Sequence, residues 1–313
     1  GTASGPAPLM RLLEKLGALC EQYVDRFVDA RFIVDVMNLI GVCVVAGNVR
    51  RSSEIALGEA ADEEFLSLKN NDELNALFGQ QYQIGANNPE WAAIQKKIDN
   101  LVAKRAKHGL GVLDADYAAI QIKIDKLSKA QRQILVQDFA WFELQKQINE
   151  HPLMTHRWAS NNTVMCEVGE TDYAPILANT IRNGEPGLAW PEIFKAFGRL
   201  SDPPNHKDRN AEGFNPCGEQ TLHDMELCCL VETYPTKHRD LKDYLHTLKY
   251  AYRYAKAVTL VPTHNARTNA VMVRNRRIGT SMAGIAEMYS NLGMYKCAQW
   301  WDAGYREICQ WDT

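Results

Sequence analysis

The sequence predicts an α/β protein that is interrupted by a helical insertion. Helical and strand-like patterns alternate in residues 1–70 and again in residues 151–313. Residues 71–150 instead show helical periodicity and are rich in Gln, Lys, Asn, Ala and Ile. With 313 residues, of which 46% are hydrophobic, the chain is long enough for one large α/β domain or two ordinary ones.

The first part, residues 1–70, opens on the breaker cluster Gly5-Pro6-Ala7-Pro8, so we expect the chain to be a piece of a longer polypeptide. Leucines at helical spacing then predict two helices within residues 9–40. The apolar run 43–46 fits the end of a helix or of a strand. Residues 54–58 are typical of a buried strand, and residues 62–69 of a short helix.

The insertion, residues 71–150, contains a weak internal repeat. Residues 91–99, 117–125 and 141–149 each form an amphipathic helical pattern that opens on an aromatic residue. The repeat predicts a helical hairpin or three-helix appendage. A module that binds a partner or regulates the protein is the alternative.

The last part, residues 151–313, returns to a mixed pattern. We expect strands at 163–165 and 227–232, helices at 172–183 and 244–259, and an exposed polar loop over 200–213. Small residues in 281–286 favour close backbone packing.

Composition narrows the possible functions. The net charge of −3 gives no argument for nucleic-acid binding, and no apolar run reaches the roughly 18 residues of a membrane span. The start of the chain lacks the charged region of a signal peptide. The eight cysteines are dispersed without zinc-like spacing, which predicts no metal site and fits a reducing cytoplasm.

The pentapeptide 215–219 is the strongest candidate for chemistry. Asn215, Cys217 and Glu219 alternate along the chain, so an extended segment would point all three side chains the same way. A thiol can exchange a hydrogen atom with carbon, a carboxylate can take a proton from a hydroxyl, and an amide can hold that hydroxyl. A lone cysteine is more often a core residue, but Pro216 and Gly218 impose a tight backbone that packing does not need.

Other polar residues have simpler interpretations. Cys228 and Cys229 are adjacent, so at most one is expected to be redox-active, and strand packing is the alternative for both. The pairs Arg50-Arg51 and Arg276-Arg277 could bind phosphate, but salt bridges at element ends are favoured. His151 and His156 are interpreted as loop and helix-cap residues.

Seven segments in order resemble the catalytic subunit of the ribonucleotide reductases. The match is closest to class II, whose members depend on adenosylcobalamin, and it covers the chain except for about residues 70–150. NPCGE, without a leucine before the cysteine, favours class II over the diiron-dependent class I. The segments are SGPAPLM (4–10), VVAGNVRRS (44–52), HRWASNN (156–162), NGEPGLAW (183–190), FNPCGE (214–219), ELCCLVETYPT (226–236) and NRRIGTSMAGI (275–285).

The resemblance implies a ten-stranded α/β barrel with a central finger loop, incomplete in this chain. Residues 1–70 and 151–313 would form parts of the barrel, and 71–150 the insertion. Cys217 would carry a thiyl radical inside the barrel, where solvent cannot quench it. Asn215 and Glu219 would hold and deprotonate the ribose hydroxyls, and Cys228 would be one of two reducing cysteines.

The implied reaction converts ribonucleotides, di- or triphosphates, to 2′-deoxyribonucleotides for DNA synthesis. It implies nucleotide effectors, a thioredoxin-type reductant and the remaining part of the reductase chain as partners. In the family, the first reducing cysteine precedes SGPAP, and the substrate-phosphate loop and the C-terminal cysteines that relay electrons lie downstream of the position of residue 313. We therefore expect residues 1–313 not to turn over alone. No residue of this chain is assigned to bind the cofactor.

Two alternatives stay open from the sequence. One is the large subunit of a class I reductase. The other is a non-catalytic barrel fragment that binds a nucleotide or a partner through the insertion. The retained set Asn215, Cys217, Glu219 and Cys228 argues against a scaffold, because a scaffold gains nothing from polar groups around a thiol.

Overall fold

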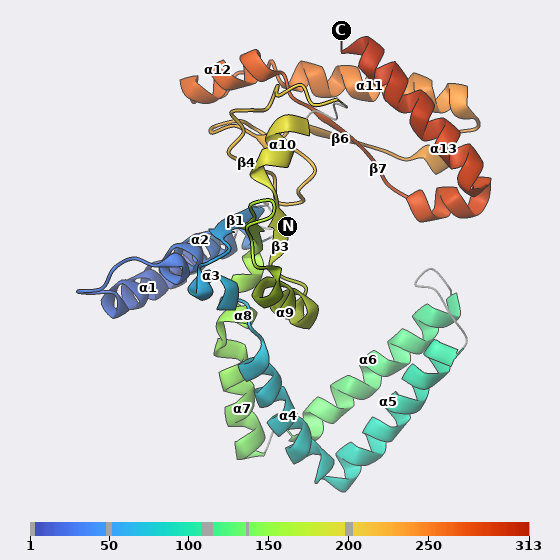
Figure 1. The fold of residues 1–313 in the computed structure, drawn as a ribbon. Helices are drawn as coiled ribbons and strands as arrows, with labels where there is room; N and C mark the ends of the chain where they lie inside the picture. The colour runs from blue at the N-terminus through green and yellow to red at the C-terminus, as the bar shows by residue number, and fades with distance from the viewer. Residues whose placement is uncertain (1–3, 48–51, 108–114, 136–137, 198–202, 313) are drawn as a thin grey trace. The chain divides into compact units, whose positions relative to one another are not determined.

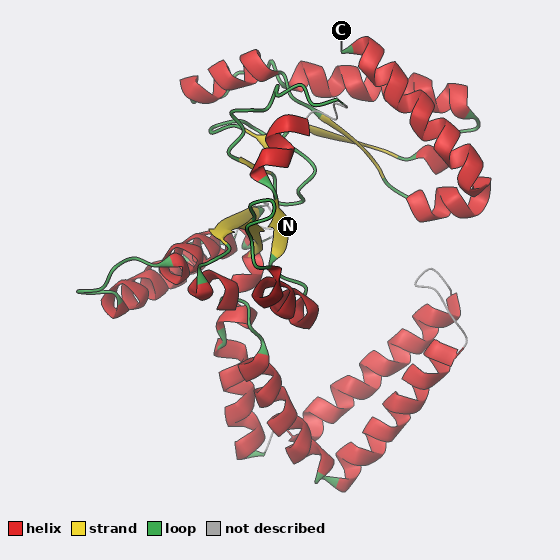
Figure 2. Ribbon diagram, in the orientation of Figure 1, coloured by secondary structure: helices red, strands yellow, loops and turns green. Residues whose placement is uncertain are grey.

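A computed structural model describes residues 4–47, 52–107, 115–135, 138–197 and 203–312. Arg50 and Arg51, for which we considered phosphate binding, lie outside these residues. Helices make up most of the described chain (Figure 2). The chain forms two compact units, one of residues 1–164 and 172–187, the other of residues 165–171 and 188–313.

The first unit begins with α1 (Ala7–Gln22) and α2 (Ala30–Val45), which pack against each other. The apolar run 43–46 is thus the end of a helix. The three-stranded sheet has the order β1 (Glu54–Glu59), β2 (Ser160–Met165), β3 (Gly187–Ala189). Along the sequence, the connections between these strands include α3 (Glu63–Ser67), α8 (Pro152–Thr155), the 3₁₀ turn η1 (Arg157–Ala159) and α9 (Tyr173–Asn183).

The described part of the insertion consists of four helices and short connections: α4 (Asp72–Ala86), α5 (Pro89–Lys107), α6 (Ala115–Leu135) and α7 (Phe139–Glu150). Helix α5 packs along α6, and α4 along α7 (Figure 1). Ile98, Ile120 and Ile124 form one buried cluster, and Trp91, Leu135 and Trp141 another.

The three repeat copies lie on α5, α6 and α7. Each copy has an apolar face, and each makes the same polar contact within its helix. The glutamine at the fifth position of each copy donates a hydrogen bond four residues ahead. These pairs are Gln95 with Asp99, Gln121 with Asp125, and Gln145 with Asn149, at 2.8–2.9 Å. The predicted helices of the repeat are confirmed.

Aspartate side chains begin several helices. The carboxylates of Asp29, Asp62, Asp138, Asp172 and Asp240 each accept a backbone N–H of the first turn that follows. These N–H groups have no partner inside their own helix, so each carboxylate satisfies one of them. The negative charge of the carboxylate also interacts favourably with the positive end of the helix dipole. Gly184, with φ of 83°, ends α9 in the left-handed conformation that glycine adopts without strain.

The second unit contains α10 (Pro191–Phe197), β4 (Gly213–Phe214), β5 (Thr221–Leu222), β6 (Leu230–Thr233), the 3₁₀ turn η2 (Pro235–Lys237), α11 (Leu241–Val258), α12 (Ala266–Asn275), β7 (Gly279–Met282) and α13 (Ile285–Trp311). Helices α11 and α13 pack together (Figure 1). Their buried core consists of Tyr244, Leu248, Met288, Cys297 and Trp300.

The strands of the second unit form two separate pairs. β4 and β5 are antiparallel, with Gly213 opposite Leu222 and Phe214 opposite Thr221. β6 and β7 are parallel, and their register places Leu230 opposite Gly279. A Cβ at Gly279 would lie 2.4 Å from Leu230 Cδ2, so a larger residue there would displace the end of the Leu230 side chain.

Several expectations need correction. The predicted strand 227–232 begins only at Leu230, because residues 226–228 make other contacts that are described below. The loop 203–213 is not uniformly exposed, since Asp208 and Ala211 are buried. The seven strands of the described residues form three separate sheets, so the predicted ten-stranded barrel is not closed there. The described helices include none that is long and apolar enough to cross a membrane.

Candidate active site

The pentapeptide 215–219 forms the tip of the β4–β5 hairpin. The backbone N–H of Asn215 donates to the Gln220 carbonyl at 2.9 Å, and the N–H of Gly218 donates to the Asn215 carbonyl at 2.8 Å. Gly218 has φ of 80°, a conformation that only glycine adopts without cost. The segment is therefore a tight turn, as Pro216 and Gly218 predicted, and not the extended segment in which all three side chains would point the same way.

The turn nevertheless brings the predicted side chains together. The Asn215 side-chain amide donates to Glu219 Oε1 at 2.6 Å and to Cys228 Sγ at 3.3 Å. Its oxygen accepts the Gln220 backbone N–H at 3.0 Å. Asn215 is buried, with 4% of its surface exposed, so its orientation is fixed by these contacts.

The surroundings of Cys228 favour the neutral form of its thiol. The protein around the Cys228 sulfur lowers its hydration, and this raises the pKa of the thiol. The nearby groups Glu219, Cys229 and Cys217 raise that pKa further, whereas the hydrogen bond from Asn215 opposes the rise. Cys228 is therefore held mainly as a thiol, the form that can donate hydrogen.

Exposure differs among the site residues. Cys217, Glu219 and Cys228 are exposed, and Cys229 is buried, its carbonyl accepting the Gly279 N–H at 2.9 Å. The packing interpretation thus fits Cys229 and is wrong for Cys228. We predicted that Cys217 lies inside a barrel, but it is exposed, because the described strands form no closed ring around the hairpin.

A buried network of charged side chains contacts the hairpin at Thr221 of β5. The Arg277 guanidinium contacts Asp208 Oδ2 at 2.5 Å, Glu226 Oε1 at 3.1 Å and Thr221 Oγ1 at 3.1 Å. Arg277 therefore forms salt bridges, as we favoured. The sequence analysis missed Asp208 and Glu226, because a polar stretch gives no sign of which carboxylate is buried.

Gln220 was also missed. Its side chain is 4% exposed, and within the described residues neither its amide oxygen nor its nitrogen has a hydrogen-bond partner. A buried amide without partners is costly, and this one directly follows Glu219. Its position in the sequence, directly after the pentapeptide, is the feature that could have indicated it as a candidate site residue.

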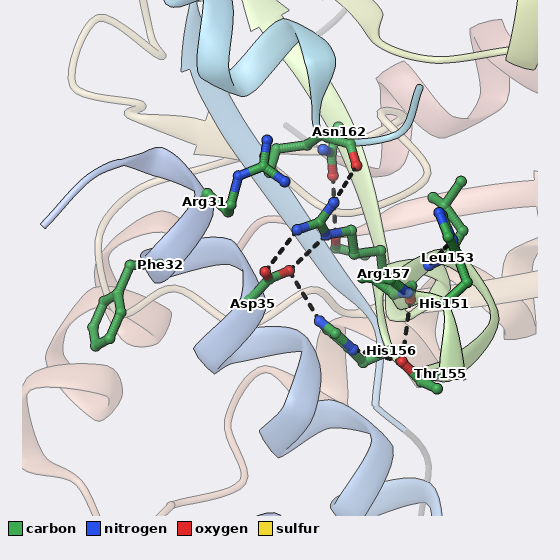
Figure 3. Close-up of polar contacts among 12 residues, drawn as sticks. Arg31, Phe32, Asp35, His151, Leu153, Thr155, His156, Arg157 and Asn162 are labelled. Atoms are coloured by element: carbon green, nitrogen blue, oxygen red, sulfur yellow. Dashed lines mark hydrogen bonds and ion pairs between the residues drawn. The ribbon is translucent and has the colours of Figure 1, made fainter. Parts of the chain in front are cut away.

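A second buried cluster lies in the first unit and links Asp35 of α2 to the segment HRWASNN. Arg157 donates to both oxygens of Asp35, at 2.7 and 2.8 Å, and His156 Nε2 lies 3.0 Å from Asp35 Oδ1 (Figure 3). Burial alone would raise the pKa of Asp35, but its contacts with Arg157 and His156 lower it to about 2. The cluster joins α2 to η1, and Arg157 also donates to the Leu68 carbonyl at 2.9 Å.

The histidines take structural roles. His151 precedes α8, and its Nδ1 accepts the Leu153 N–H at 3.3 Å, which confirms the predicted helix cap. His156 instead belongs to the Asp35 cluster.

Comparison with curated proteins identifies one group of relatives. The chain is 36% identical over 312 residues to the adenosylcobalamin-dependent ribonucleoside-triphosphate reductase of Euglena gracilis. This chain is a homologue of part of the adenosylcobalamin-dependent ribonucleoside-triphosphate reductases. It is also 36% identical over 313 residues to a probable enzyme of the same name from Dictyostelium discoideum, and 32% identical over 293 residues to that of Lacticaseibacillus paracasei.

The match covers all of this chain for the Euglena and Dictyostelium reductases, and 93% of it for the Lacticaseibacillus reductase. The chain spans about a third of the length of these reductases, from 29% to 32%. No protein-family model and no solved structure matches it. The resemblance to class II reductases is thereby confirmed.

Proposed function

We propose that this chain is the segment of an adenosylcobalamin-dependent ribonucleoside-triphosphate reductase that carries the radical thiol. The observation that carries the proposal is the contact of Asn215 with both Glu219 and Cys228, beside an exposed Cys217. The names of the relatives support the triphosphate substrate and the cofactor. They do not favour a class I subunit or a scaffold.

The residues suit the cofactor's chemistry. When bound, adenosylcobalamin supplies a carbon-centred radical that can take a hydrogen atom from a thiol. Cys217 is the thiol on which that chemistry would act, because it lies exposed at the hairpin tip. No residue of the described chain is assigned to hold the cofactor.

The side chains then have distinct roles toward the ribose. Cys217, having lost its hydrogen atom, takes the hydrogen from C3′ and later returns one. The Glu219 carboxylate accepts the proton of the 3′-hydroxyl, and Asn215 orients Glu219 through the 2.6 Å hydrogen bond. Cys228 donates a proton as the 2′-hydroxyl leaves as water.

The electrons come from a cysteine pair. Cys228 and a second cysteine supply two electrons and become a disulfide, and a thioredoxin-type dithiol reduces that disulfide again. The second cysteine belongs to the remaining part of the reductase polypeptide. Nucleotide effectors act through that part as well.

The same polypeptide would complete the architecture. We propose that the strands of residues 1–70 and 151–313 contribute to a ten-stranded α/β barrel that the rest of the reductase closes. Residues 71–150 form an insertion with its own apolar clusters. The free cysteines fit the cytoplasm as the place of action.

The test is nucleotide reduction by the complete polypeptide that contains this segment. Wild type, Cys217→Ser and the control Cys309→Ser are assayed with ribonucleoside triphosphate, adenosylcobalamin and a dithiol. We expect deoxynucleotide from the wild type and from Cys309→Ser, which removes an exposed cysteine in α13, and none from Cys217→Ser. Equal product from Cys217→Ser, or turnover that needs a diiron subunit in place of the cofactor, would contradict the proposal.

A further inference from the structure

One guanidinium in the second unit contacts both ends of a short segment that joins the two reactive parts of the site. The segment, residues 221–226, begins two residues after Glu219 and ends two residues before Cys228. Arg277 reaches Thr221 at the first end and Glu226 at the other. It comes from the connection between α12 and β7, far away in the sequence.

The contacts at the first end are cross-linked. The Thr221 hydroxyl donates to Asp208 Oδ2 at 2.8 Å, and the same carboxylate oxygen accepts from Arg277 at 2.5 Å. Thr221 is the first residue of β5, so this triangle fixes the strand that follows the Cys217 turn. A change here would reach Glu219 through Gln220, the one residue between them.

The contacts at the second end fix the approach to Cys228. Glu226 accepts from Arg277 with one oxygen and from the His223 backbone N–H with the other, at 2.9 Å. The next residue, Leu227, donates its N–H to Met272 Sδ at 3.2 Å. The backbone that carries Cys228 is thus held at Glu226 and Leu227.

The network is buried, so water does not compete for its hydrogen bonds. The Arg277 side chain is 4% exposed, and those of Asp208 and Glu226 are 0% exposed. One cation faces two carboxylates, so removal of Arg277 would leave two buried negative charges without the guanidinium that contacts both. The planar guanidinium reaches three acceptors in different directions, which a lysine ammonium on a flexible stem does not reproduce.

We propose that Arg277 is a positioning residue that sets the separation between the Cys217–Glu219 turn and Cys228. The proposal rests on the proposed function insofar as these thiols are the reactive ones. Arg277 touches none of the site residues Asn215, Cys217, Glu219 or Cys228 in the contacts described above, so it acts through the two ends of segment 221–226.

The test compares three variants of the complete reductase polypeptide. Arg277→Gln removes the cation, and Arg277→Lys keeps the charge while it loses the fork geometry. Arg267→Gln is the matched control, because Arg267 forms an exposed ion pair at 2.8 Å with Asp224 in the same segment. Each is measured for turnover, for thermal stability, and for the alkylation rate of Cys228 relative to the exposed Cys309.

We expect turnover to fall about 100-fold in Arg277→Gln, because small displacements of reacting groups have effects of that size. Cys228 alkylation becomes faster relative to Cys309, because segment 226–229 no longer holds the sulfur in the dehydrated surroundings that raise the pKa of its thiol. Arg277→Lys retains more thermal stability than Arg277→Gln but shows the same direction of change in turnover and alkylation. Arg267→Gln matches the wild type in all three measurements.

A folded Arg277→Lys with wild-type turnover and wild-type Cys228 alkylation overturns the proposal. If Arg277→Gln fails to fold, Arg277→Lys decides the outcome alone. If the wild-type polypeptide shows no nucleotide reduction, the proposed function fails, yet the alkylation ratio still reports whether Arg277 positions Cys228.

Discussion

The side-chain nitrogen of Asn215 lies 3.3 Å from the sulfur of Cys228, thirteen residues along the chain. This contact joins the hairpin tip to the segment that leads into β6. The same amide donates to Glu219, so one buried side chain relates the carboxylate to the thiol. The arrangement of the candidate site therefore depends more on Asn215 than on any direct contact between its reactive groups.

Replacement of Asn215 by alanine is expected to destabilise the fold by about 2 kcal/mol, because the buried Gln220 N–H loses its acceptor. The measurement is urea denaturation followed by circular dichroism. The control is Asn179→Ala, which removes a longer bond of 3.4 Å to the Pro175 carbonyl and should change stability by less than about 0.5 kcal/mol. Equal midpoints for both variants would show that the Asn215 contacts do not stabilise the hairpin.

The substitution Glu219→Gln is expected to speed alkylation of Cys228 by iodoacetamide. Removal of the negative charge lowers the pKa of Cys228, so more of the reactive thiolate is present at a fixed pH. At about pH 8 we expect a roughly threefold increase in rate. Peptide mass spectrometry measures the rate, with Cys309 as the internal reference. An unchanged ratio of the two rates would show that Glu219 does not influence the thiol.

Acid should weaken the Asp35 cluster. The pKa of Asp35 is lowered from 3.8 to about 2, so its carboxylate stabilises the fold above pH 3.8, and this contribution is lost as the pH falls toward 2. The difference in unfolding free energy between wild type and Asp35→Asn should therefore narrow by roughly 2 kcal/mol between about pH 4 and pH 2. Denaturant titrations at several pH values measure it.

The control for the acid experiment is Asp72→Asn, which removes an exposed ion pair with Arg182. Its effect should stay below about 1 kcal/mol at each pH, because solvent screens exposed pairs. A difference between wild type and Asp35→Asn that stays constant with pH would contradict the assigned pairing.

Two glycines of α4 provide a packing test within the insertion. A Cβ at Gly85 would lie 2.6 Å from the Trp91 ring, whereas nothing lies within 4 Å of one at Gly79. Gly85→Ala should therefore destabilise the protein by about 1–3 kcal/mol, because the core is overpacked. Gly79→Ala should stabilise it by up to about 1 kcal/mol, since alanine favours the helix. Thermal unfolding of both variants measures this, and effects of the same sign would be contrary to the structure.

The sequence alone predicted most of the local helices and strands, and it selected the residues of the candidate site. Helical periodicity identified the three repeat copies, and the amide, thiol and carboxylate of the pentapeptide suggested the chemistry. It did not predict how these side chains meet. Asn215 reaches Glu219 because Gly218 reverses the chain, and an alternation pattern contains no information about that reversal.

Sequence patterns could not predict which residues pair over long distances in the chain. Arg277 and Asp208 are 69 residues apart, and Asp208 lies in a stretch whose composition is that of an exposed loop. Asp35 and Arg157 are 122 residues apart, on either side of the insertion. Periodicity reports which face of an element is buried, but not which partner covers it.

The parallel pairing of β6 with β7 has a consequence for synthesis of the protein. Strand β6 directly follows Cys228 and Cys229, but its partner strand comes only after α11 and α12. While a ribosome is still translating these helices, the Cys229 carbonyl lacks the Gly279 N–H that it accepts in the finished fold. The nascent chain thus displays the edge of β6 without its partner strand until β7 has been synthesised, and chaperones that act during translation would meet it in that form.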